Sequence, residues 1–164
     1  MNDPNSDTGA VYKNIREVDE IFEITKIISR ELTAMGVGYT LLEDMSLKDT
    51  IRYLNTRMTK ADIAIEIHKD SFDAKDSKRV GMYIDIEGKS SRQLSDEFLK
   101  VFLSSGASKD SWIRPHTLRN LAFVKDIRFP SLIAEFGHLQ DETCISDREY
   151  YGVNFCKIFQ KIKI

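Results

Sequence analysis

The feature that most constrains the fold of this chain is the alternation of strand-like and helix-like segments. The clearest strand covers residues 61–68, where three isoleucines point to one face and Glu66 and His68 to the other. Residues 15–35 repeat apolar side chains at steps of three and four, which predicts a buried helix ended by Gly36. Strands alternating with helices are typical of an α/β fold with a mostly parallel sheet.

The remaining segments extend the same pattern over the whole chain. We therefore expect one α/β domain over residues 1–164, with a mostly parallel twisted sheet and helices on both faces. Ser46 precedes a helix-like segment and is its expected N-cap. The further expected elements are strands over 39–42, 80–86 and 131–134 and helices over 47–58, 94–102, 118–124 and 150–162.

Composition limits the classes of function. The formal net charge of -2 argues against a nucleic-acid-binding protein, which normally has a basic excess. No apolar run approaches the roughly 20 residues of a membrane span. Residues 1–7 are polar and lack a signal-peptide layout, so we expect synthesis in the cytoplasm without a signal peptide. Cys144 and Cys156 form no CxxC pair and are expected to be ordinary thiols.

Three residues are the main candidates for a functional site. His68 and Glu135 close two predicted strands, where ligands of parallel sheets bind, and Glu17 opens the first helix. An imidazole and two carboxylates can provide zinc ligands and a general base. Each residue also has an ordinary interpretation: Glu17 as a partner of the helix dipole, His68 as a hydrogen-bonded cap and Glu135 as a paired buried carboxylate.

Three other residues are secondary candidates. Glu66 shares a strand face with His68, and it is a substitute ligand, a partner that orients His68, or one half of an ion pair with a lysine or arginine. His138 follows Glu135 by three residues and is a possible substitute metal ligand. Arg114 is a candidate for binding a sugar or a peptide carboxylate, with an ordinary loop residue as the alternative.

Four segments of the chain together resemble the zinc-dependent N-acetylmuramoyl-L-alanine amidases, the cell-wall amidases of bacteria and their phages. The resemblance covers nearly the whole chain, and it is the order and spacing of the segments that carries it. The segments are DTGAV at 7–11 followed by Glu17, the strand at 61–68, GMY at 81–83, and LRNL at 118–121 continuing to PSLIAEFG at 130–137.

The resemblance implies a role for each main candidate. Glu17 and His68 would be ligands of one zinc ion, and Glu135 would be the catalytic carboxylate that activates the attacking water. The substrate would be peptidoglycan, cleaved at the amide between N-acetylmuramic acid and L-alanine. A phage-lysin-like enzyme of this kind acts on the cell wall once it is released from the cytoplasm.

The chain also departs from the family pattern. The family's first strand ends in Gly-His, whose histidine is the first zinc ligand, and this chain starts where that pair would end. We therefore expect a sheet without the first strand, with an exposed edge that a partner chain can complete. The alternatives are a catalytically incompetent binding or regulatory module, a shortened form of a longer amidase, and another metal hydrolase on the same α/β plan.

Overall fold

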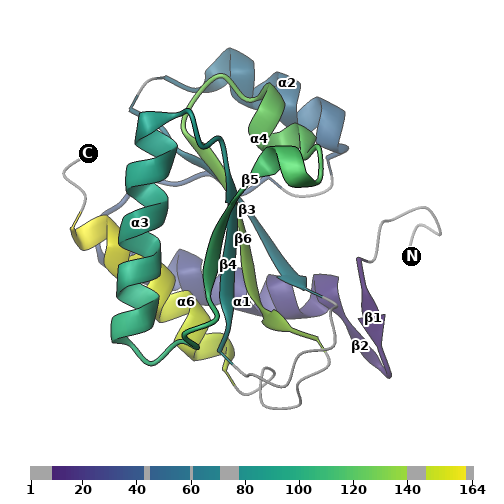
Figure 1. The fold of residues 1–164 in the computed structure, drawn as a ribbon, viewed down its shortest axis with the longest axis vertical. Coiled ribbons are helices and arrows are strands. Elements are labelled where there is room, and N and C mark those ends of the chain that lie inside the picture. Colours follow the sequence, from purple (N-terminus) through teal and green to yellow (C-terminus); the bar gives the residue numbers. More distant parts are fainter. Residues whose placement is uncertain (1–8, 43–44, 60, 71–77, 140–146, 162–164) are drawn as a thin grey trace.

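The computed structural model describes residues 9–42, 45–59, 61–70, 78–139 and 147–161 (Figure 1). No helix among these residues is long and apolar enough to cross a membrane. The strands are β1 (Val11–Tyr12), β2 (Ile15–Arg16), β3 (Ala64–Asp70), β4 (Val80–Ile84), β5 (Trp112–Pro115) and β6 (Ser131–His138). The helices are α1 (Glu17–Ala34), α2 (Leu47–Arg57), α3 (Lys89–Ser104), α4 (Ala122–Asp126) and α6 (Arg148–Cys156), with 3-10 turns η1 (His116–Leu118) and η2 (Lys157–Gln160).

The central sheet is mixed, with strand order β3-β6-β4-β5. The pairs β3–β6 and β4–β5 are parallel, whereas β4 and β6 are antiparallel. The α/β fold class predicted from the sequence is thus confirmed, and two of the three pairings have the expected direction. Within the described part of the chain, β3 lies at one edge of the sheet.

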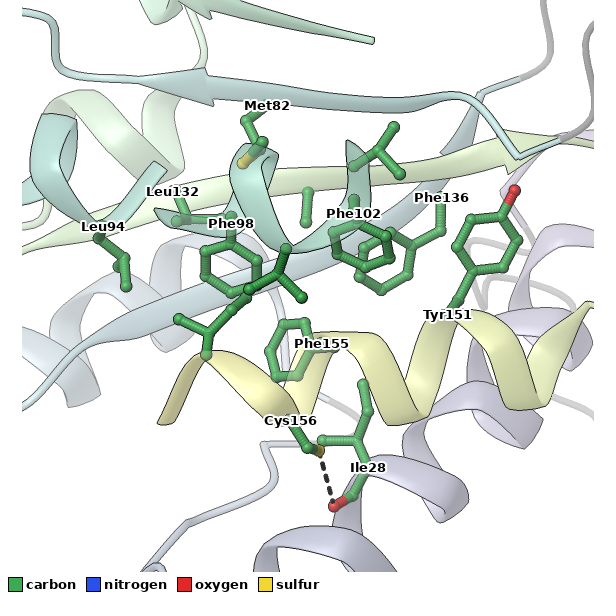
Figure 2. Close-up of a cluster of buried hydrophobic side chains, with 14 of the residues drawn as sticks. Ile28, Met82, Leu94, Phe98, Phe102, Leu132, Phe136, Tyr151, Phe155 and Cys156 are labelled. Carbon is green, nitrogen blue, oxygen red and sulfur yellow. Dashed lines mark hydrogen bonds between the residues drawn. The ribbon is translucent and has the colours of Figure 1, made fainter. Parts of the chain in front are cut away.

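Helices cover both faces of the sheet, and each covered face has its own apolar core (Figure 1). On one face, α1, α3 and α6 enclose an aromatic cluster in which Phe136 of β6 stacks on Tyr151 of α6, with ring centroids 5.3 Å apart. Figure 2 shows Phe98, Phe102 and Phe155 packed around the same strand. The smaller core on the other face lies under α2 and α4. The two cores hold between them the sheet whose strands β3 and β6 carry His68 and Glu135.

Local sequence signals explain where the helices begin. The Ser46 hydroxyl accepts a hydrogen bond from the Asp49 N–H at 3.2 Å, so the predicted N-cap of α2 is confirmed. The buried residues of α1 follow at four-residue steps, which places one stripe of the helix against the sheet. They are Glu20, Ile24, Ile28 and Leu32.

The expected strand over residues 39–42 is wrong. These residues form no strand, and the side chains of Tyr39 and Leu41 are 43% and 45% exposed. A strand is stabilised by its neighbours rather than by intrinsic preference, and in the described residues nothing pairs with this segment.

Other elements differ in extent from their predictions. The predicted short helix over 118–124 is divided into η1 and α4, and the final helix starts earlier, at Arg148, and continues into η2. Strand β5 and the β1–β2 hairpin were not predicted. Cys156 is buried with a free thiol, as expected, whereas Cys144 and the first two residues of the DTGAV segment lie outside the described residues.

Candidate active site

Glu17 is held in place by the short hairpin that precedes α1. The β1–β2 hairpin turns the chain back so that the Glu17 N–H donates to the Ala10 carbonyl at 2.8 Å. The Ala10 N–H in turn donates to Glu17 Oε2 at 2.9 Å. Gly9 has φ +63, and a Cβ atom there would lie 2.6 Å from Glu17 Oε2, so only glycine allows this close approach. The Gly-Ala of the family-like opening segment therefore has a direct structural role in orienting the carboxylate.

The imidazole of His68 lies between two carboxylates. Its Nδ1 atom is 3.0 Å from Glu17 Oε1, and its Nε2 atom is 3.6 Å from Glu66 Oε1. Glu17 Oε1 also accepts the N–H of Lys69 at 3.1 Å. Of the roles left open for Glu66, the structure favours the partner that orients His68 through its second ring nitrogen. The His68 side chain remains 41% exposed, so the pair is open to solvent on one side.

These contacts shift both pKa values. Burial by itself lowers the pKa of His68, but the contacts with Glu17 and Glu66 and the charge of Glu135 outweigh it and raise the pKa to about 10. Burial likewise raises the pKa of Glu17, yet the hydrogen bonds from His68, Ala10 and Lys69 bring it below its ordinary value. Without a metal the pair is therefore an imidazolium and a carboxylate, and a metal ion would replace the imidazole proton.

Glu135 is brought beside His68 by the sheet. In the parallel β3–β6 ladder His68 pairs with Glu135, and in the antiparallel β4–β6 ladder Glu135 pairs with Gly81. The β3–β6 register shifts just beyond this point, between His68 and Asp70, where Gly137 adopts φ +68. Register shifts of this kind are common next to active sites, where they change the direction in which a side chain points. Glu135 is half-buried and, with His138, lines a small cavity of about 10 Å³.

An aromatic and a cationic side chain form the wall on the β5 side of Glu135. Trp112 lines the same small cavity and packs edge-on against Tyr83, with ring centroids 4.8 Å apart. The guanidinium of Arg114 lies 4.3 Å from the centroid of the Trp112 ring and is exposed to solvent. Arg114 thus stands on strand β5, two residues after Trp112, rather than in a loop.

The donor atoms of Glu17 and His68 are close enough together to be compared with two ligands of one zinc ion. Ligands at about 2.0–2.1 Å from a tetrahedral zinc are separated by roughly 3.3 Å, and the 3.0 Å between Glu17 Oε1 and His68 Nδ1 is close to that spacing. In the described ranges, however, no group of three or more His, Cys, Asp or Glu side chains could hold a metal ion. His138 is buried at the end of β6 and does not join Glu17 and His68 in such a group. Its role as a substitute ligand stays a prediction.

Sequence reasoning missed one set of polar residues next to this pair. Glu20 is 3% exposed and Lys69 is 2% exposed, and both are ionisable groups within the protein interior. A signal was present, because Glu20 begins the four-residue repeat of buried positions continued by Ile24 and Ile28. A carboxylate in an apolar stripe is costly unless it is paired or hydrogen-bonded, and the sequence alone did not identify its partners.

The comparisons with known proteins identify the family. Residues 4–151 match the family described as N-acetylmuramoyl-L-alanine amidase, and the chain belongs to this family of hydrolases. No curated protein matches the chain. The four segments that carry the resemblance lie within the matched residues, so the family expected from the sequence is confirmed.

Solved structures of amidases share the fold. The N-acetylmuramoyl-L-alanine amidase from Clostridium difficile 630 has a TM-score of 0.78 at 15% identity, covering 96% of this chain and 90% of that chain. AmiC2 of Nostoc punctiforme has a TM-score of 0.72 at 17% identity, covering 94% and 88%. The CwlD amidase from Clostridioides difficile, solved in complex with the GerS lipoprotein, has a TM-score of 0.64 at 14% identity, covering 94% and 92%.

Proposed function

We propose that this chain is a zinc-dependent amidase that hydrolyses the bond between N-acetylmuramic acid and L-alanine in peptidoglycan. The observation that carries the proposal is the contact of Glu17 with His68 at 3.0 Å, directly beside Glu135 in the sheet, in a chain of the amidase family. A carboxylate–imidazole pair with metal-ligand spacing next to a second carboxylate can supply two metal ligands and a general base, which suits metal-assisted hydrolysis of an amide.

Each residue then has a distinct task. Glu17 and His68 would hold the zinc ion, which as a Lewis acid polarises the amide carbonyl when bound. Glu135 accepts a proton from the attacking water as the new C–O bond forms. It returns this proton to the nitrogen of L-alanine as the C–N bond breaks, so that the peptide leaves as a neutral amine. Glu66 keeps the imidazole ring of His68 in orientation through Nε2.

Arg114 is the proposed substrate-binding residue. Its exposed guanidinium lies over the Trp112 ring, beside the small cavity that Glu135 lines. A guanidinium in this position can form a charge-assisted pair with a carboxylate of the stem peptide. Replacing Arg114 with Gln should therefore raise KM for peptidoglycan fragments and leave kcat nearly unchanged; a fall in kcat at constant KM would contradict this role.

The test of the proposed activity is the release of L-alanine amino termini from purified peptidoglycan in the presence of zinc. Glu135→Gln and His68→Ala should each abolish the release, because they remove the proton acceptor and a metal ligand. Glu87→Gln is a matched control, since Glu87 is an exposed carboxylate in the turn after β4. Intact activity in both site variants would refute the proposal.

A second candidate function is a non-catalytic amidase-like module that binds or regulates. It is favoured by the fact that the described residues bring together two metal donors rather than three. This module would be fully folded without metal, and its melting temperature would be indifferent to a chelator. A clear stabilisation by zinc that the chelator reverses would exclude it.

We further propose that a strand from a partner chain completes the sheet at β3. The outer edge of β3 is unpaired in the described residues, and a groove of about 1100 Å³ opens between the start of this strand, α2 and the segment that follows α1. The structure of the CwlD amidase with the GerS lipoprotein is an example of an amidase with a protein partner. An added strand would form main-chain hydrogen bonds along the outer edge of β3, with which no strand pairs in the described residues.

A synthetic peptide tests this edge. A strand of about six residues with alternating valine and isoleucine, ending in Gly-His, has the length of an ordinary strand and supplies one further imidazole. Its addition should raise the melting temperature and tighten zinc binding, whereas the same peptide ending in Gly-Ala should raise only the melting temperature. The proposal would be contradicted if neither peptide changed the melting temperature or the zinc affinity.

The place of action follows from the proposed substrate. We propose that the chain, once released from the cytoplasm, degrades the cell wall in the manner of a phage lysin. The turbidity of a suspension of purified bacterial cell walls should fall after the zinc-loaded protein is added. Unchanged turbidity with a protein that cleaves soluble peptidoglycan fragments would argue against action on the intact wall.

A further inference from the structure

A buried cluster of charged side chains lies directly beside the Glu17–His68 pair. Glu20 of α1 is 3% exposed, and the Lys69 side chain of β3 is 1% exposed. Glu20 Oε2 lies 3.6 Å from Lys69 Nζ and accepts a hydrogen bond from Arg148 Nε at 3.0 Å. Arg148 also donates from Nη2 to Glu20 Oε1, so the guanidinium binds the carboxylate through two bonds.

The stability of the fold does not by itself require this cluster. A buried ion pair gains little net stability, because the cost of removing two charges from water offsets their attraction. Apolar side chains of similar size would fill the same space at least as favourably, as they do at Ile24 and Ile28 on the next turns of α1. The position of the cluster in the fold therefore calls for another explanation.

Two members of the cluster, Glu20 and Lys69, are close neighbours of candidate metal ligands. Glu20 follows Glu17 by one turn of α1, and Lys69 follows His68 in β3. The backbone N–H of Lys69 donates to Glu17 Oε1, the same oxygen that contacts His68 Nδ1. Arg148 is the first residue of α6, which packs along α1. The cluster thus joins the start of α1, the end of β3 and the start of α6 at one point.

We propose that Glu20 and Lys69 are positioning residues. Their contact holds α1 at the point along β3 where the Glu17 carboxylate contacts the His68 imidazole. This inference rests on the proposed function, in which Glu17 and His68 bind the metal. Neighbouring residues of a strand point to opposite faces, so Lys69 faces α1 while His68 faces the other side of the sheet. Glu17 reaches His68 only from the first residue of the helix, and a small slide of α1 along the sheet separates the two donor atoms.

The double variant Glu20→Met with Lys69→Met tests the proposal. It removes the charges of both Glu20 and Lys69 at once. The Arg148 side chain is 34% exposed, so its guanidinium can reorient toward the solvent. The variant should fold and melt close to the wild type, yet bind zinc about tenfold to a hundredfold more weakly, as expected when residues behind metal ligands are lost. The single variant Glu20→Gln leaves Lys69 charged and buried, so it should melt at a lower temperature.

A matched control separates positioning from general destabilisation. Leu94→Ala removes a buried side chain of α3 that packs near Leu132, at the end of the core away from Tyr151 (Figure 2). It should lower the melting temperature and leave the zinc affinity unchanged. Equal zinc affinity in the wild type and in the double variant would overturn the proposal and leave the cluster with a purely structural role.

A second measurement does not depend on metal binding. In the metal-free protein, the ¹⁵N shift of His68 Nδ1 reports its contact with Glu17, and it should move in the double variant but not in Leu94→Ala. An unchanged shift in the double variant would overturn the proposal. If the wild type binds no zinc, the proposed function fails as a metal site, while this shift still decides whether Glu20 and Lys69 position the pair.

Discussion

The replacement of Gly81 by alanine is a sharp test of how the wall beside Glu135 is built. Gly81 lies between Trp112 of β5 and Glu135 of β6 in the sheet. A Cβ atom at this position would lie 2.2, 2.4 and 2.7 Å from three atoms of the Trp112 ring, which is far closer than van der Waals contact allows. The ring must therefore move away from the strand.

The energetic cost follows from the contacts that the ring loses. Overpacking of this kind costs about 1–3 kcal/mol, and the edge-on contact of Trp112 with Tyr83 contributes about 0.5–1.5 kcal/mol. The reduced entropy of the unfolded chain returns about 0.4–1 kcal/mol. We expect Gly81→Ala to lower the free energy of unfolding by about 1–3 kcal/mol.

Urea unfolding followed by fluorescence measures this change directly, because Trp112 is the chain's one tryptophan. The variant should unfold at a lower urea concentration, and its native emission should shift as the ring becomes more exposed. Gly38→Ala is the control, since a Cβ atom there meets nothing within 4 Å. An unchanged midpoint and emission in Gly81→Ala would refute the packing argument.

Three further changes test other parts of the structure. The metal-free chain should lose about 1–2 kcal/mol of stability as the pH rises from 6.5 to about 10, because folding raises the pKa of His68 while solvent at its 41% exposed side chain screens part of the interaction. His68→Gln should flatten this decline in urea titrations, and an equally steep decline would show that another group titrates. Ser46→Ala should cost about 1 kcal/mol by removing the cap of α2, and an unchanged melting curve would contradict this. Phe136→Ala should cost about 3–5 kcal/mol by calorimetry, since the ring is 0% exposed, and a loss below about 1 kcal/mol would be incompatible with its packing.

Local patterns were enough to predict most of the fold. The alternating side chains of β3, the four-residue repeat of α1 and the cap at Ser46 each reflect interactions within a few residues, and the structure has all three. The segment 39–42 failed because its strand character depends on a neighbour that the described residues do not contain. Strand β5 was missed because its four residues are recognisable only through their pairing with β4.

The candidate site was predictable to a similar degree. Glu17 is the first residue of α1, as predicted, whereas His68 and Glu135 do not end their strands, because β3 continues to Asp70 and β6 to His138. The register of β3 with β6 nevertheless brings His68 beside Glu135. The contact of Glu66 with His68 was one of several open roles, since a strand face does not determine a partner. The pairing of Glu20 with Arg148 joins residues far apart in the sequence, and such long-range ion pairs leave no local signal.

The zinc content of the purified chain tests the central claim most directly. The protein is equilibrated with a zinc buffer, dialysed, and analysed for metal and protein, together with Glu17→Ala, His68→Ala and the surface control Glu87→Gln. We predict about one zinc per chain in the wild type and the control and none in the two ligand variants. A well-folded wild type without zinc, or equal zinc in all four proteins, would contradict the assignment of Glu17 and His68 as the metal-binding pair of an amidase.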